Sequence, residues 1–208
     1  MDLDKIFSDI IPELDKKDSV REELIKLSRL GIRNCSVAIK KLHRKEADAS
    51  DYINEARMQL KKMINVVEKN PRAEMNNYLH TLYQEFVEAI ALQAIFNHEE
   101  IPVPSQADPT IPAVSFLLGL CDTVGELRRA CLDCVRDENF DDATYYFSMM
   151  EHLHDYLNSL DYPNAIIPNV RHKSDVNRKL INVTRSNLTL VLHMNKFQKK
   201  LGISEEDE

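Results

Sequence analysis

Hydrophobic residues recur with helical spacing along nearly the whole chain. Apolar positions repeat every three or four residues, whereas the alternation typical of β-strands is rare. The predicted helices are Leu3 to Leu14, Ser19 to about Lys45, Ala49 or Ser50 to Lys69, Asn77 to Asn97, about Pro112 to Asp137, Asp141 or Asp142 to Leu160, and about Ser174 to Lys200. We therefore predict an all-α protein of about seven helices in a bundle or superhelix.

Prolines separate the predicted helices. The first helix ends near Pro12 to Lys17, Asn70-Pro71 ends the third, and residues 98–111 form a proline-rich loop. The 208 residues suffice for one sizeable core, so a single domain over residues 1–208 is expected. The acidic tail, residues 201–208, is expected to be disordered.

The helix predicted from Asn77 to Asn97 carries two carboxylates in a segment that is otherwise apolar. Glu88 is the only charge between Phe86 and Phe96, and Glu85 precedes it by three residues. A carboxylate surrounded by protein must be paired, protonated or metal-bound. The i,i+3 spacing lets both side chains point at one spot. Ion pairs with Lys or Arg of a neighbouring helix remain the alternative.

A second acidic pair follows in the next predicted helix. Asp122 and Glu126 are spaced i,i+4 on the face opposite its apolar stripe. Such a pair on a surface helix is often merely solvated. Two helices that each carry an acidic pair can, however, enclose a divalent cation such as Mg²⁺, which prefers oxygen ligands.

A stripe of cations runs along the helix predicted from Ser19. Its members are Lys26, Arg29, Arg33, Lys40 and Arg44. A solvated helix face is the alternative interpretation. Because few i,i+4 acids compensate these cations, the stripe favours an anionic partner. The net charge of -7 argues the other way, since nucleic-acid-binding domains usually carry a basic excess.

Other chemistry is disfavoured by motif counts. Cys131 and Cys134 form a CxxC without a second CxxC or a ligand-spaced His pair, so we interpret them as apolar packing. Glu151 and His154 form the one ExxH motif, whereas di-iron bundles use two. No signal peptide or apolar span of about 18 residues is evident, so we expect a soluble, cytoplasmic protein with no membrane partner.

Longer motifs carry a resemblance to a known family. They are Leu24–Arg29 (LIKLSR), Leu42–Arg44 (LHR), Gln84–Ala89 (QEFVEA), Phe116–Arg128 (FLLGLCDTVGELR) and Asp175–Leu180 (DVNRKL). With these motifs the chain resembles the translin/TRAX family, and more closely the TRAX branch, over nearly its whole length.

The resemblance implies a fold, an assembly and an activity. Family members are all-helical and form closed, roughly octameric shells around RNA or single-stranded DNA. TRAX proteins are metal-dependent endoribonucleases, whereas translin mainly binds nucleic acid. The acids of the QExxEA and DxxGEL motifs form the Mg²⁺ site in TRAX, and they correspond here to Glu85, Glu88, Asp122 and Glu126; Mn²⁺ is an expected substitute.

The chain also departs from eukaryotic TRAX, because it lacks the basic N-terminal extension and the long central insertion. We therefore expect a compact, archaeal-type protein that forms a homo-octamer by itself. The expected function is a Mg²⁺-dependent endoribonuclease in which the cation stripe holds the RNA backbone. A translin-like binder of single-stranded RNA or DNA without catalysis, and a helical scaffold without a nucleic-acid partner, remain the alternatives.

Overall fold

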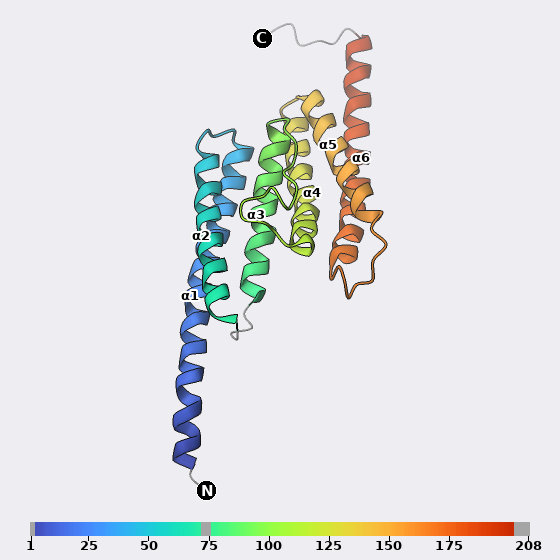
Figure 1. Ribbon diagram of the computed structural model, residues 1–208. Coiled ribbons are helices and arrows are strands. Elements are labelled where there is room, and N and C mark those ends of the chain that lie inside the picture. Colours follow the sequence, from blue (N-terminus) through green and yellow to red (C-terminus); the bar gives the residue numbers. More distant parts are fainter. Residues whose placement is uncertain (1–2, 72–75, 202–208) are drawn as a thin grey trace. The chain divides into compact units, whose positions relative to one another are not determined.

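The computed structural model describes residues 3–71 and 76–201, and the long elements in these ranges are six α-helices (Figure 1). The helices are α1 (Leu3–His43), α2 (Ala49–Lys69), α3 (Asn76–Phe96), α4 (Ala113–Arg136), α5 (Phe140–Asn158) and α6 (Val170–Leu201). The predicted all-α fold is confirmed. The expected disordered tail lies, apart from Leu201, outside the described residues.

The predicted break after the first helix is wrong, because α1 continues through Pro12. An interior proline removes one helical hydrogen bond and costs about 3 kcal/mol, which is why a helix end was expected there. The following turns are nevertheless helical, and the i,i+4 ion pair between Lys17 and Glu13 at 2.9 Å supports them. The first two predicted helices are therefore one, which leaves six instead of seven.

Two compact units make up the chain, one ending at Gly119 and the other beginning at Leu120. In the first unit α1 packs against α2 and α3, and α2 also packs against α3. Fully buried side chains from each helix form its core, including Leu24, Leu60 and Phe86. The single domain expected over residues 1–208 stays a prediction.

Two glycines allow helices of the first unit to approach closely. A Cβ atom at Gly31 of α1 would lie 2.6 Å from a methyl carbon of Leu82 in α3. At Gly119 of α4 it would lie 2.6 Å from Val87 Cβ and 2.7 Å from the carbonyl oxygen of Gln84. No other residue type fits at Gly119 without a shift of α3 or α4.

The segment between α3 and α4 contains no helix or strand, as its prolines predicted. It is tied to the helices nonetheless. Lys61 of α2 donates to Asp108 at 2.6 Å, and the side chain of Ile111 is buried. This loop is therefore a packed part of the first unit.

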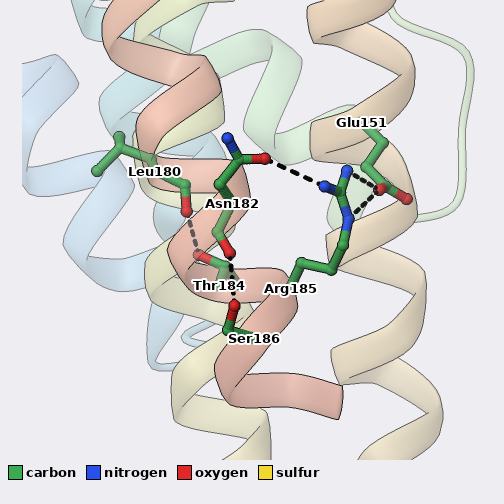
Figure 2. Close-up of polar contacts among 6 residues, drawn as sticks. All are labelled: Glu151, Leu180, Asn182, Thr184, Arg185 and Ser186. Atoms are coloured by element: carbon green, nitrogen blue, oxygen red, sulfur yellow. Dashed lines mark hydrogen bonds and ion pairs between the residues drawn. The ribbon is translucent and has the colours of Figure 1, made fainter.

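Polar contacts join the helices of the second unit. Figure 2 shows Arg185 of α6 directed at Glu151 of α5, where Nη2 and Nε donate to Oε1 at 2.7 and 3.2 Å. Asn177 of α6 donates to the backbone oxygen of Cys121 in α4 at 2.9 Å. Glu151 of the ExxH motif thus takes part in a contact between helices.

Helix α6 begins at Val170, four residues before the predicted start, and thereby includes Lys173. Its buried side is lined by Val170, Ser174, Asn177, Ile181, Thr184 and Leu188. Among the described residues, no helix is both long and apolar enough to cross a membrane.

Candidate metal-binding carboxylates and cationic helix face

Glu85 and Glu88 lie in the middle of α3, in the first unit. Both are half-buried, and the intervening Phe86 and Val87 are fully buried. Burial first, and then the negative charges of Glu85 and Glu88, raise the pKa of the Cys35 thiol far above its usual value. Cys35 of α1 therefore lies beside the two carboxylates, on the packed side of that helix.

Asp122 and Glu126 lie one turn apart on α4, in the second unit, and both are half-buried. Lys173 Nζ of α6 donates to both oxygens of Asp122, at 2.7 Å to Oδ1 and 2.5 Å to Oδ2. Glu126 Oε2 lies 3.6 Å from Arg129 Nη1. At least one acid of the predicted metal site is thus neutralised by a cation of the chain itself.

The Asp122–Lys173 pair was not predicted from the sequence. The two residues are 51 positions apart, and Lys173 was counted only as one of several cations of the last helix. No local pattern reveals a partner at that separation. Only the packing of α6 against α4 shows it.

The four acids therefore fall into two pairs, one in each compact unit. Within residues 3–71 and 76–201, no group of three or more His, Cys, Asp or Glu side chains gathers closely enough to hold a metal ion. The shared Mg²⁺ site of Glu85, Glu88, Asp122 and Glu126 stays a prediction.

The cation stripe is exposed to solvent along its whole length and lies on α1, except for Arg44, which directly follows the last residue of that helix. Its members are Lys26, Arg29, Arg33, Lys40 and Arg44. In the part of the chain that the structure describes, no carboxylate pairs with the first four, whereas Arg44 Nη1 lies 3.7 Å from Glu46 Oε1. By helical periodicity the stripe lies nearly opposite Cys35, and hence on the other side of α1 from Glu85 and Glu88.

The four cysteines are free thiols, and three of them are buried. Burial is the main cause that raises the pKa of Cys121 to about 12 and that of Cys131 to about 11. Both thiols are therefore protonated at neutral pH and are weak nucleophiles.

Comparison with protein families gives a match to the Translin family over residues 19–183. The chain belongs to the Translin family. The match covers all four carboxylates and the whole cation stripe of this family member. It leaves out the first turns of α1 and the second half of α6.

A curated relative, uncharacterized protein MJ0175 of Methanocaldococcus jannaschii, is 36% identical over 206 residues, which is 95% of this chain and 90% of the relative. Among solved structures, that of AfC3PO superposes with a TM-score of 0.79 at 26% identity. A complex of AfC3PO with duplex RNA gives a TM-score of 0.70 at 27% identity, and both comparisons cover 90% of this chain and 97% of the other. Apo-NeC3PO shares the fold, with a TM-score of 0.72, 22% identity, and coverage of 91% and 96%.

Proposed function

We propose that this Translin family member is an archaeal, TRAX-like, Mg²⁺-dependent endoribonuclease that binds RNA within a closed homo-octamer in the cytoplasm. The observation that carries RNA binding is the row of exposed cations Lys26, Arg29, Arg33 and Lys40, for which the described residues offer no acidic partner. Cations kept together in this way, despite their mutual repulsion, favour an anionic partner. The similar AfC3PO has been solved with duplex RNA, which supports an RNA partner.

The proposed metal site consists of Glu85, Glu88, Asp122 and Glu126. These side chains offer only carboxylate oxygens, a donor set that suits Mg²⁺ or Mn²⁺. Within the first unit, Gly119 of α4 contacts Gln84 and Val87, the neighbours of Glu85 and Glu88. Helical spacing puts Asp122 and Glu126 on the same face of α4 as Gly119. The resemblance to TRAX in the QExxEA and DxxGEL motifs supports one site made by both pairs.

In the proposed mechanism, a bound Mg²⁺ supplies an activated water and neutralises charge on the phosphodiester. The carboxylates of Glu85 and Glu88 would hold the ion from α3. Asp122 and Glu126 would hold it from α4, and the ammonium group of Lys173, which donates to Asp122, would then be available to an RNA phosphate. Arg29 and Arg33 hold the RNA backbone without reading its sequence.

The cation stripe lies on the side of α1 away from Glu85 and Glu88, and this arrangement favours an assembly of several copies. Helix α1 stands between the stripe and Glu85, so an RNA strand that lies along the stripe does not directly meet Glu85 of the same copy. In a closed shell, the stripe of one copy can hold RNA whose scissile phosphate lies at the carboxylates of another. Self-association is for this reason part of the proposal.

Cleavage assays test the proposal directly. We expect parental protein to cleave labelled single-stranded or duplex RNA with Mg²⁺ but not with EDTA. The isosteric Glu88→Gln variant should retain RNA binding, and its cleavage rate should fall by more than about 100-fold. Loss of a residue that only hydrogen-bonds a metal ligand already costs up to about 100-fold, so loss of a ligand should cost more. Glu55→Gln, which changes an exposed acid of α2, is the matched control and should leave cleavage unchanged.

A second function, RNA binding without catalysis, is favoured by one observation. Lys173 already neutralises Asp122, as it would if the acids served only the fold. Binding with no Mg²⁺-dependent cleavage, equal in parent and Glu88→Gln protein, would establish this alternative and reject the nuclease.

A further inference from the structure

The first turns of α1 present an apolar face that no described residue of the first unit covers. Leu3, Phe7, Ile10 and Leu14 follow one another at spacings of four, three and four residues, and are 44% to 57% exposed. The same repeat, interrupted by the charged residues Lys17 and Arg21, leads on to the buried positions Leu24, Gly31, Cys35, Ala38 and Leu42. Helix α1 extends past the ends of α2 and α3, so its first turns have no packing partner among these two helices (Figure 1).

The last turns of α6 present a second face of the same design. Leu190, Met194, Phe197 and Leu201 repeat the spacing of four, three and four residues, and are 57% to 63% exposed. In the second unit this part of α6 extends past the start of α5 (Figure 1). We call Leu3, Phe7, Ile10 and Leu14 the α1 seam, and Leu190, Met194, Phe197 and Leu201 the α6 seam.

Both seams have the pattern of a two-helix coiled coil. Alternating steps of three and four residues place apolar side chains along one line, and each such seam buries itself against another of equal length. Both seams span twelve residues. Pro12 falls on the side of α1 away from its seam, where its ring does not obstruct a partner helix.

The charges around the two seams are of opposite sign. Residues 3–14 of α1 carry Asp4, Asp9 and Glu13 against one cation, Lys5, and of these Asp4 and Glu13 lie beside the seam. Residues 190–201 of α6 carry Lys196, Lys199 and Lys200, of which Lys200 lies beside the seam, and residues 176–201 include no acidic residue. Opposite charge favours pairing of the α1 segment with the α6 segment. Pairing of two α1 segments or two α6 segments from different copies would bring like charges together.

We propose that the α1 seam of one copy packs against the α6 seam of a second copy. This inference rests on the self-association included in the proposed function, and it names the surfaces. Both seams lie outside residues 19–183, which the family model matches, so the contact is a property of this chain's outer segments. An isolated helix of four turns is marginal in water, and the contact gives both projecting helices the packing partner they need.

Complementation between two variants tests the pairing. Phe7→Asp disrupts only the α1 seam, and Phe197→Asp disrupts only the α6 seam. Each variant alone should lose the mass of the parental assembly in light scattering coupled to size exclusion. An equimolar mixture retains one intact seam of each kind, so it should form a species that contains both variants. Ile10→Asp with Met194→Asp is a second pair that should behave alike, and Tyr156→Asp, at an exposed position of α5, should keep the parental mass.

Three results would overturn the inference. If either single variant keeps the parental mass, its seam is not an interface. If the mixture forms no joint species, the seams pair with themselves or within one chain. A monomeric parent would reject this contact together with the self-association in the proposed function, whereas missing Mg²⁺-dependent cleavage with an intact assembly would reject the nuclease alone.

Discussion

Lys173 of α6 donates to both carboxylate oxygens of Asp122 in α4, at 2.7 and 2.5 Å. The side chains of these residues remain 31% and 35% exposed, so solvent screens the pair, and its contribution to stability is at most about 1 kcal/mol. A contact of that strength can yield to a divalent cation and RNA. It also competes with the proposed metal for Asp122.

Lys173→Gln removes an ion pair that competes with Mg²⁺ for Asp122. If that pair contributes about 0.5–1 kcal/mol, the Mg²⁺ concentration needed for half-maximal cleavage should fall by roughly two- to fivefold. The rate at saturating Mg²⁺ should fall, because the ammonium group no longer reaches the phosphate. Titration of the RNA cleavage rate with Mg²⁺ measures both effects. An unchanged or higher Mg²⁺ requirement would show that Lys173 does not compete for the site.

The contact of Gly119 with α3 makes a prediction about stability. Gly119→Ala should destabilise the protein by about 1–3 kcal/mol, since its Cβ meets Val87 Cβ and a backbone oxygen, neither of which can move freely. Gly31→Ala should cost less, because the atoms it meets are the far end of the Leu82 side chain. Gly125→Ala is the control within α4: no atom lies within 4 Å, so it should gain up to about 1 kcal/mol of helix propensity. Urea unfolding followed by circular dichroism measures the stabilities of the three variants, which we expect to rise from Gly119→Ala to Gly31→Ala to Gly125→Ala. Equal unfolding midpoints for all three variants would contradict this order.

RNA binding by the cation stripe predicts a change in salt dependence. The Arg29→Gln/Arg33→Gln double variant should bind all RNA sequences more weakly. The slope of log affinity against log salt concentration should flatten by about one for each RNA phosphate that the variant no longer neutralises. Fluorescence anisotropy at several salt concentrations measures the slope.

A matched double variant, Arg136→Gln/Arg178→Gln, removes the same charge from cations already paired with Asp133, Asp137 and Asp175. Its slope should change little. If both double variants flatten the slope equally, the RNA responds to overall charge and the α1 stripe is not its site.

The buried thiol of Cys131 makes stability depend on alkaline pH. Burial, then the neighbouring Cys134, raise the pKa of Cys131 from 9.0 to about 11. The stabilisation is fully present below pH 9, where the thiol is neutral in folded and unfolded chains. Above pH 9 only the unfolded chain loses the thiol proton readily, so the free energy of unfolding should fall up to pH 11, by at most about 1.4 kcal/mol per pH unit. Unfolding of parent and Cys131→Ala protein between pH 8 and 11 measures this; equal pH slopes would contradict it.

Much of the fold was predictable because its signals are local. Cys35, Ala38 and Leu42 keep helical spacing and are indeed buried, and the exposed stripe of Arg29 and Arg33 lies on the opposite side of α1. The break at Pro12 was wrong, because the cost of one interior proline does not end a helix whose flanking turns favour it.

Tertiary relationships were out of reach of the same reasoning. Half-burial of Glu85 and Glu88 followed from their apolar neighbours, but the nearness of Cys35 did not. The ion pair of Asp122 and Lys173 joins distant segments and leaves no periodic trace in the sequence. The close approach at Gly119 depends on which helix lies opposite, which spacing along one helix does not reveal.

Mn²⁺ binding measured by electron paramagnetic resonance tests the proposal that carboxylates from α3 and α4 form one metal site. Parental protein, Glu88→Gln, Asp122→Asn and the control Glu55→Gln would each be titrated with Mn²⁺. We expect the parent and the control to bind Mn²⁺ with the same affinity, and each of the other two variants to lose the same bound signal, because both acid pairs hold one ion. Unchanged Mn²⁺ binding in Glu88→Gln or in Asp122→Asn would show that α3 and α4 do not share a site, and the proposed catalytic centre would be wrong.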